Sequence, residues 1–380
     1  MWQSVILFIQ RVLRPLVPDR LRQRRRDRMH SGQAHRRDLL AATVGPEVLR
    51  GLAFEAGPAE HRALESLGRT EDVRFSPSSR RLALAGFYSD RVLVLSTRIV
   101  PAGETYRVIC DGPVMLTSPA FRHPHGLAFL DDETLLVASR YGGVAVFALP
   151  PPAAGSAELR LDPIRTLRGT RLGLRFNPGS VDVIQGEEAG RTRVLVCSNY
   201  SDSVTSHSLS ADDGFDARYD GVLLKRGLST PDGISVSPDQ KWIAVSNHED
   251  GTVRIFERGP GLGPRSEPAG LLRGLAEPHG LRFTPDGRHL IVADASGPWL
   301  HVFASEDGDW RGPRDATRPV RTLDEETFQR GLAAPNDGGP KGITLDGEAR
   351  VVATTCEFQV LAFFDLQRLL AGTHQTVDDR

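Results

Sequence analysis

The sequence predicts an all-β fold made of six similar units, and two observations point to it. A phrase recurs along the chain, and its clearest copies read PHGLAFLDDETLLVAS, PDGISVSPDQKWIAVSN and PHGLRFTPDGRHLIVAD. The six copies begin at Glu71, Pro124, Val181, Pro231, Pro278 and Pro340. A repeat of roughly 40–60 residues, built from short strands and tight turns, is typical of a β-propeller. We therefore predict a six-bladed β-propeller whose copies pack face to face in a ring.

Each copy predicts the strands of one blade. In the copy that begins at Pro278, GLRF is a short alternating run, TPDG is a polar turn, and HLIVA is a β-branched run typical of a strand covered on both faces. WLHVF follows a second turn as the third strand. Further strand-like segments stand where a fourth strand would lie, at residues 105–109, 162–167, 222–227, 270–275 and 319–323. The blades are therefore predicted to be four-stranded.

The sixth copy has no obvious segment of this kind immediately after it, because the chain continues as DLQRLLAGTHQTVDDR. However, HRALESLGRTEDVRF near the start matches the pattern of GLLRGLAEPHGLRF. We predict that a strand near residues 61–67 closes the last blade and so removes an open sheet edge. The propeller is assigned to residues 51–380, with blades starting near residues 72, 125, 182, 232, 279 and 341.

Residues 1–50 are predicted to be a basic, amphipathic helical extension. The first 40 residues hold ten arginines and three acidic residues, and apolar residues recur between Trp2 and Leu16 at helical spacing. The longest apolar run is too short to span a bilayer, and no signal-peptide pattern is present. Two interpretations stay open. The helix packs on the propeller or on a partner subunit, or residues 1–28 lie against anionic lipid.

Composition limits the partners and the compartment. The chain of 380 residues has a net charge of −1, which argues against general electrostatic binding to the phosphate backbone of nucleic acids. Its three cysteines fall in separate copies, without metal-type spacing and in an odd number, so disulfides are not expected. This favours a reducing compartment, and we expect a cytoplasmic protein, peripheral to the inner membrane if residues 1–28 bind lipid.

Chemistry in a propeller is expected where the innermost strands open onto the central axis. The residues assigned to this position are all ionisable: Asp72, His125, Asp182, Asp232, His279 and Lys341. Titratable groups gathered at one axis cost desolvation and repulsion unless a ligand, a metal or water balances them. A small-molecule site in the funnel is one interpretation, and a solvated structural funnel is the other.

A second row of candidate residues follows each middle strand. As substrate-binding residues it offers Tyr88, Arg140, Tyr141, Asn199, Tyr200, Asn247 and His248. Aromatic rings, a guanidinium and amides suit the wall and rim of a small-molecule pocket. Because Asn and His also serve well in tight turns, a purely structural role is the alternative.

The copies PHGLRFTPDGRHLIVAD and PDGISVSPDQKWIAVSN resemble blades of the gluconolactonase and regucalcin-like propellers, and of the wider YVTN and NHL group. The resemblance covers roughly residues 71–366. It implies a divalent cation, often calcium, held on the axis by acidic and amide residues. Asp232 matches the aspartate of that pattern, and Asp72, preceded by Glu71, stands in place of its glutamate. His125 and His279 depart from the pattern, and mixed His and Asp ligands favour zinc, iron or manganese over calcium.

Two classes of function follow. The first is an enzyme with its active site in the axial funnel, a lactonase-type hydrolase or an isomerase of an oxygenated metabolite. In its metal-dependent form, a cation held by Asp72, Asp232, His125 and His279 activates water. In its metal-free form, His125 or His279, oriented by an aspartate, is the general base and Lys341 stabilises an oxyanion. Asp182 is expected opposite Lys341. The second class is a non-catalytic propeller that binds a protein or glycan.

Overall fold

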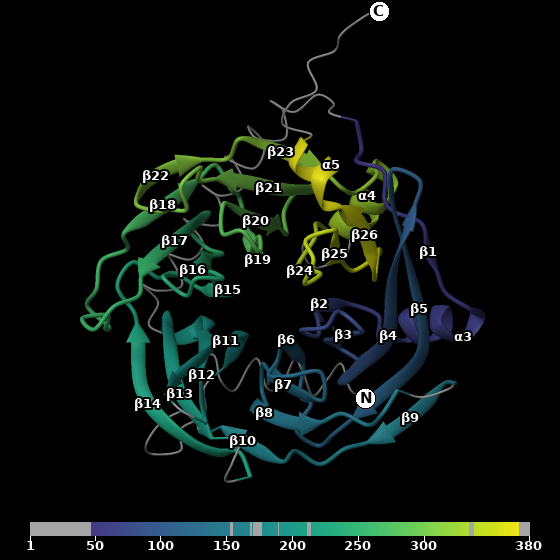
Figure 1. Ribbon diagram of the computed structural model, residues 1–380, viewed down its shortest axis with the longest axis horizontal. Coiled ribbons are helices and arrows are strands. Elements are labelled where there is room, and N and C mark those ends of the chain that lie inside the picture. Colours follow the sequence, from purple (N-terminus) through teal and green to yellow (C-terminus); the bar gives the residue numbers. More distant parts are fainter. Residues whose placement is uncertain are drawn as a thin grey trace, which may run out of the picture. The chain divides into compact units, whose positions relative to one another are not determined.

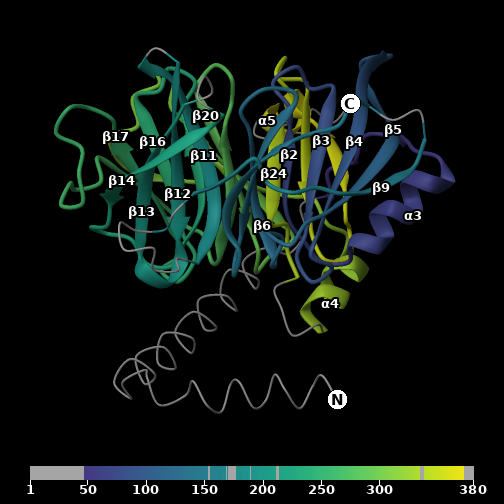
Figure 2. The same cartoon turned by 90° about the horizontal axis from the view of Figure 1, so that it is seen from below.

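The computed structural model describes residues 47–152, 155–167, 169, 177–188, 190–210, 214–333 and 338–371. These residues form six sheets arranged as blades around a central axis, with the first strand of each blade nearest the centre (Figure 1). The prediction of a six-bladed β-propeller is confirmed. Seen from the edge of the ring, the strands stand upright beside one another (Figure 2). The predicted helix within the first 46 residues lies outside the described residues.

The first three blades follow the repeat in chain order. Blade one contains β2 (Thr70–Phe75), β3 (Arg81–Gly86), β4 (Arg91–Ala102) and β5 (Thr105–Thr117), with β1 (Phe54–Glu55) and β9 (Ala157–Arg160) at its outer edge. Blade two contains β6 (Pro124–Phe129), β7 (Thr134–Ser139), β8 (Gly143–Ala148) and β10 (Arg165–Leu167). Blade three contains β11 (Pro178–Glu188), β12 (Arg191–Ser198), β13 (Ser203–Ser210) and β14 (Asp216–Leu224), and the short helix η2 (Asn199–Ser201) follows β12.

The last three blades complete the ring. Blade four contains β15 (Pro231–Val236), β16 (Trp242–Asn247), β17 (Thr252–Glu257) and β18 (Gly270–Arg273), with β22 (Gly312–Asp315) at its edge. Blade five contains β19 (Pro278–Phe283), β20 (His289–Asp294), β21 (Trp299–Ala304) and β23 (Arg318–Arg321). Blade six contains β24 (Gly342–Leu345), β25 (Val351–Thr355) and β26 (Ala362–Asp365). Among the described residues, the α-helices are α3 (Pro58–Leu67), α4 (Glu325–Ala333) and α5 (Leu366–Ala371).

The predicted closing strand at residues 61–67 is wrong, because these residues belong to helix α3. Pro58 stands in its first turn, and Leu64 and Leu67 are three positions apart and buried together on one face. That face packs on blade one, in a core cluster that contains Val108 and Cys110 of β5. The apolar spacing of HRALESL is therefore helical.

The segment ahead of α3 lies along the seam between the last blades and the first. The backbone N–H of Leu49 donates to the carbonyl of Arg321 in blade five, and that of Leu52 donates to Phe363 in blade six. β1 then pairs in parallel with β5 of blade one. In the described part of the chain, blade six has three strands, and β26 is the outermost. The extended segment bonds to β26 through Leu52, where we had predicted a fourth strand.

The core consists of layers between neighbouring blades. Six buried clusters each combine side chains of two adjacent blades, and the cluster between blades six and one closes the ring. One blade alone would expose both faces of its middle strand, so the ring is the smallest unit that buries them. The three cysteines are buried and free, as the sequence predicts. Among the described residues, no helix combines the length and apolar character needed to cross a membrane.

Candidate functional site at the propeller axis

A β-bulge in each of five inner strands aims one side chain at the axis. In β6, Pro124 pairs with Ser139 and Gly126 pairs with Ala138, so His125 between them has no pairing partner. The same irregularity recurs in β2, β11, β15 and β19. Bulges of this kind redirect a side chain out of the regular pleat. The equivalent residues of the six blades form what we call the axial ring: Glu71, His125, Gly179, Asp232, His279 and Lys341.

Two of the predicted axial residues are in the wrong register. In blade one, Val73 and Phe75 are buried in the same positions of the repeat as Leu127 and Phe129 of blade two, which places Glu71, and not Asp72, in the ring. The carboxylate of Asp72 instead accepts hydrogen bonds from the backbone N–H of Val73 and of Leu127. The buried apolar positions therefore set the register, and aligning the copies on them would have identified Glu71.

The same correction applies to blade three, where Val181 takes the position of Leu127 and Gly179 takes that of His125. Asp182 lies three residues further along the strand and is absent from the ring. Gly179 leaves space for a neighbour, because a Cβ atom there would come within 2.2 Å of Asn199 Oδ1 and 2.8 Å of Asp232 Oδ1.

Four ring residues converge in a buried cluster. His125 Nε2 lies 3.7 Å from Glu71 Oε2 and 3.8 Å from Asp232 Oδ1. His279 Nε2 lies 3.3 Å from Glu71 Oε2 and 3.2 Å from Asp232 Oδ2. The two imidazole rings stack with centroids 5.3 Å apart. His125 Nδ1 is 2.7 Å from the carbonyl oxygen of Gly179, which fixes the orientation of this ring.

Three cationic side chains surround the two carboxylates. Lys341 is fully buried, with Nζ 3.6 Å from Glu71 Oε1, and Arg69 Nε donates to the same oxygen. Arg140 Nη2 lies 2.5 Å from His125 Nε2 and 3.6 Å from Asp232 Oδ1. Lys341 was expected opposite Asp182. Its ion-pair partner is Glu71, because the ring register differs from the predicted one.

Burial and neighbouring charges drive the pKa values of this cluster apart. Burial and the Arg140 guanidinium lower the pKa of His125 to about 3. Burial also disfavours the charged form of His279, but Asp232 and Glu71 outweigh it and raise its pKa. Burial alone would raise the pKa of each carboxyl group. Nearby positive charge instead holds the pKa of both Glu71 and Asp232 well below the ordinary value. One imidazole is thus kept neutral, and the charged form of the other is favoured.

A second layer of side chains surrounds the axial ring. We call it the collar, and it consists of the residues just beyond each middle strand: Phe87, Arg140, Asn199, His248, Ala295 and Glu357. Several collar residues contact the ring residue of the next blade. The Phe87 ring lies 5.9 Å from that of His125, and the His248 ring lies 6.3 Å from that of His279. Asn199 Nδ2 donates to Asp232 Oδ1 at 2.7 Å.

Of the predicted substrate-binding residues, the structure brings Arg140, Asn199 and His248 to the ring. Tyr88, Tyr141 and Tyr200 directly follow collar residues of blades one to three, and each is about half exposed. Asn247 does not line the pocket. It is fully buried, and its side chain bonds the backbone of residues 227 and 229, so it has a structural role in that loop.

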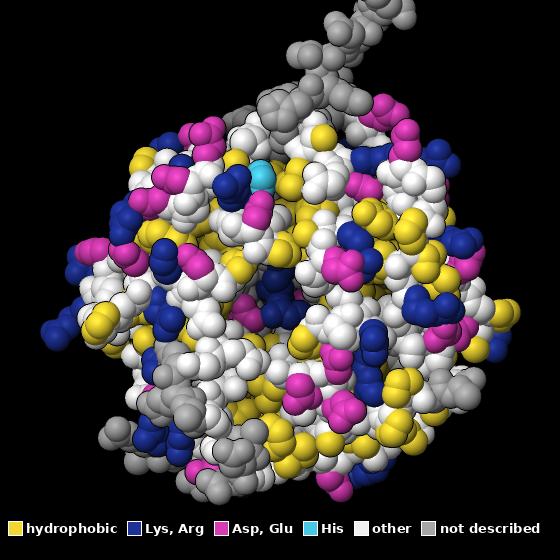
Figure 3. Space-filling model, viewed as in Figure 1, with side chains coloured by type: hydrophobic (Ala, Val, Ile, Leu, Met, Phe, Trp, Pro, Cys, Tyr) yellow, Lys and Arg dark blue, Asp and Glu magenta, His cyan; other side chains and the backbone are white. Residues whose placement is uncertain are grey.

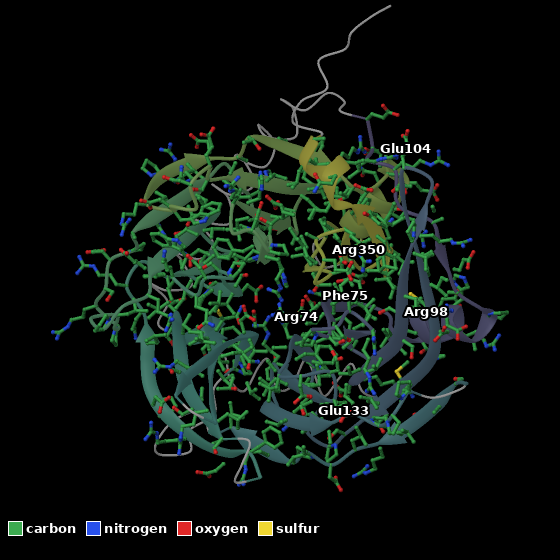
Figure 4. All side chains as sticks on the ribbon, viewed as in Figure 1. Arg74, Phe75, Arg98, Glu104, Glu133 and Arg350 are labelled. Carbon is green, nitrogen blue, oxygen red and sulfur yellow. The ribbon has the colours of Figure 1, made fainter. Side chains whose placement is uncertain are left out.

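Further along the axis, four charged residues form what we call the ionic plug. Arg74 Nη2 donates to Asp182 Oδ1 at 2.5 Å, and Arg282 Nη2 lies 3.9 Å from Asp72 Oδ2. These pairs connect blades one, three and five across the channel. Basic side chains are visible at the centre of the ring in Figure 3, and Arg74 is labelled there in Figure 4. The structure therefore places Asp72 and Asp182 in the plug, away from the histidines.

The ring can be tested against the cation that the resemblance implies. The ligand atoms of Glu71, His125 and His279 all lie within 4.8 Å of one another. Calcium does not fit, because it prefers oxygen ligands and two imidazoles face this position. The donor types suit zinc, iron or manganese, and a backbone carbonyl orients His125 as in many metal sites. However, the Arg140 guanidinium already stands at His125 Nε2. A bound metal stays a prediction.

No protein-family model and no curated protein matches this chain. Among solved structures, the chain is similar to a luciferin-regenerating enzyme, with 11% identity and a TM-score of 0.49 over 79% of this chain and 92% of the other. A putative 6-phosphogluconolactonase from Bacteroides uniformis has 13% identity and a TM-score of 0.46, over 75% and 77% of the two chains. A protein from Lactobacillus plantarum has 16% identity and a TM-score of 0.48, over 76% and 77%. These similarities concern the fold alone.

Proposed function

We propose that this protein is an enzyme that carries out general acid–base chemistry at the axial ring, as a lactonase-type hydrolase or an isomerase of a small oxygenated metabolite. The observation that supports the proposal is the pair of stacked imidazoles, whose hydrogen-bond partners give them complementary proton roles. A purely structural funnel has no need of two buried histidines between two buried carboxylates.

The partners of each ring assign its protons. The Gly179 carbonyl only accepts, so His125 Nδ1 carries hydrogen and Nε2 presents a lone pair. His279 Nε2 faces carboxylate oxygens of Glu71 and Asp232, which also only accept, so this nitrogen carries hydrogen. Two flanking carboxylates stabilise the imidazolium form of His279. His125 is therefore the proposed general base, and His279 is the proposed general acid.

For a lactone, the proposed reaction balances within this pair. His125 Nε2 takes a proton from water as the water oxygen attacks the carbonyl carbon, and the carbonyl electron pair moves onto oxygen. The C=O bond then re-forms, the ring C–O bond breaks, and the leaving oxygen takes the proton of His279 Nε2. The product is a hydroxy acid, and transfer of one proton from His125 to His279 restores the starting state. In an isomerase, His125 would remove a proton from carbon and His279 would return one.

Arg140 is the proposed oxyanion-stabilising group. It must leave His125 Nε2 before that nitrogen can accept a proton, and its guanidinium would then stand beside the reacting oxygen with several N–H donors. Lys341 was expected in this role, but it is fully buried and its ion-pair partner is Glu71. We propose that Lys341 is a positioning residue that holds the Glu71 carboxylate in place.

The exposed tyrosines also favour a second candidate, a non-catalytic propeller that binds a glycan or protein. Tyr88, Tyr141 and Tyr200 are three of the five tyrosines of the chain, and all stand beside the collar. Aromatic rings suit both the wall of a substrate pocket and a carbohydrate surface. The two candidates differ in whether the histidines are needed for turnover.

The test is turnover of a panel of γ- and δ-lactones of aliphatic and sugar acids, with acid release as the readout. Solvent deuterium incorporation, followed by NMR, covers isomerisation. His125→Ala and His279→Ala should each lower kcat/KM by at least about 100-fold, the usual range for losing a general acid or base. His289→Ala, a partly buried histidine at the start of β20, is the matched control and should keep full activity. Turnover that survives both pocket substitutions contradicts the proposal.

A further inference from the structure

Arg140 stands where a cation bound by the axial ring would have to be. Its Nη2 atom is 2.5 Å from His125 Nε2, the lone pair that a metal ion would need, and 3.6 Å from Asp232 Oδ1. A hydrogen bond from guanidinium and a bond to a metal ion cannot share one imidazole lone pair. The ion and Arg140 therefore compete for the same nitrogen.

The backbone of Arg140 is held firmly in this place. Its N–H donates to the carbonyl of His123 at 2.9 Å, and its carbonyl accepts from Asn177 Nδ2 at 2.9 Å. Two residues later the chain passes so close to Ala120 that a Cβ atom on Gly142 would be 2.3 Å from its carbonyl oxygen. The turn that carries Arg140 is therefore fixed by the fold, and its side chain points into the ring from there.

Charge leads to the same conclusion. Glu71 and Asp232 contribute two negative charges, and Arg69, Arg140 and Lys341 contribute three positive charges within 4 Å of them. These positive charges already neutralise the two carboxylates. A divalent ion would therefore add positive charge to a buried cluster that has no negative charge left to balance it. Repulsion between like charges in a buried site is several-fold stronger than in water.

We propose that the Arg140 guanidinium takes the place of the metal ion in this axial ring, so that the site works without metal, and that removing it opens a site for zinc or cobalt between Glu71, His125, Asp232 and His279. The inference concerns the resident cation and not the reaction, so it stands or falls independently of the proposed function. The sequence left a metal-dependent and a metal-free form of the enzyme open, and the inference selects the metal-free form.

The experiment is a Co²⁺ titration of untagged full-length protein, followed by visible d–d absorption, with Zn²⁺ competition and metal analysis after dialysis. The parent should show no protein-bound cobalt bands and no stoichiometric zinc. Arg140→Met should bind one equivalent, with an affinity at least about 100-fold above that of the parent, because one buried like charge has been removed. Arg140→Met combined with His279→Ala should lose this binding.

Two further variants separate the possible causes. Arg140→Lys keeps the charge but shortens the side chain, and it should still exclude the ion. Arg282→Met removes a buried arginine of the ionic plug and should leave metal binding unchanged. Stoichiometric zinc or cobalt in the parent that disappears in His125→Ala would overturn the inference, and this measurement needs no Arg140 variant to fold. Failure of a folded Arg140→Met protein to bind either ion would overturn it equally.

Discussion

Burial should make one lysine–carboxylate pair important for stability while an otherwise similar pair contributes little. Lys341 Nζ lies 3.6 Å from Glu71 Oε1, and both side chains are fully buried. Lys241 Nζ also lies 3.6 Å from a carboxylate oxygen, that of Asp239, but the exposed fractions are 73% and 51%. The two pairs share charge and distance, so the comparison isolates the effect of the surroundings.

The Coulomb attraction at this separation is about 5 kcal/mol for an effective dielectric constant of about 20, and about 1 kcal/mol in water. Removing one partner of a buried pair typically costs about 3–5 kcal/mol, because the other charge stays buried without it. Since Arg69 continues to bond Glu71, we expect Lys341→Met to lower the free energy of unfolding by about 3 kcal/mol, at the low end of this range. Lys241→Met should change it by less than about 1 kcal/mol.

The assay is denaturant unfolding of both variants beside the parent, together with a double-mutant cycle of Lys341→Met and Glu71→Gln. The coupling energy between Lys341 and Glu71 should be about 2 kcal/mol, within the range measured for residues in one network. The midpoint of thermal unfolding should fall by about 4 °C for Lys341→Met. A coupling energy near zero, or equal losses for Lys341→Met and Lys241→Met, would refute the assignment of Glu71 and Lys341 to one buried ring.

Two further predictions concern the ring and its support. Gly179→Ala should displace Asn199 from Asp232 and lower the free energy of unfolding by about 1–3 kcal/mol. The control Gly259→Ala has open space around it and should be close to neutral. Equal effects of the two substitutions would contradict the close packing at Gly179. Burial opposes ionisation of Asp294, but the His301 ring, 3.5 Å from its carboxylate, and hydrogen bonds from backbone N–H groups hold its pKa below the ordinary value. Its contribution to stability is therefore complete above about pH 4 and is lost as the pH falls below that value. When the free energy of unfolding is measured with denaturant at a series of pH values, Asp294→Asn should weaken the loss of stability at acid pH. An unchanged loss would contradict this.

The repeat was sufficient to predict the ring of blades, because each copy carries its own strands and turns within one short window. The position of the axis within each copy was harder to predict. Where PHG or PDG opens the strand, the bulged residue is evident from the sequence, and His125, Asp232 and His279 were assigned correctly to the axis. In blades one and three that tripeptide is absent, and the nearest acidic residues, Asp72 and Asp182, were chosen in place of Glu71 and Gly179.

Other features depend on contacts that no single copy contains. The helical spacing of Leu64 and Leu67 is present in the sequence, but the similarity of this segment to GLLRGL pointed to a strand. Arg140 was predicted at the rim, because its place after a middle strand does not reveal how far its side chain reaches. That reach is evident only from the folded ring, where its Nη2 atom lies 3.6 Å from Asp232 of blade four. Tertiary packing decides both cases.

The gap at Gly179 explains why this ring is asymmetric although its blades are repeats. A Cβ atom there would collide with Asn199, which bonds Asp232. The absence of a side chain thus lets the amide of Asn199 reach this carboxylate from blade three, and Arg140 of blade two lies 3.6 Å from the same oxygen. Because Asp232 is held on that side, its other oxygen faces His279, while Arg140 faces His125. The proton roles that we propose for the two histidines therefore depend on how Asp232 and Arg140 are held on either side of them.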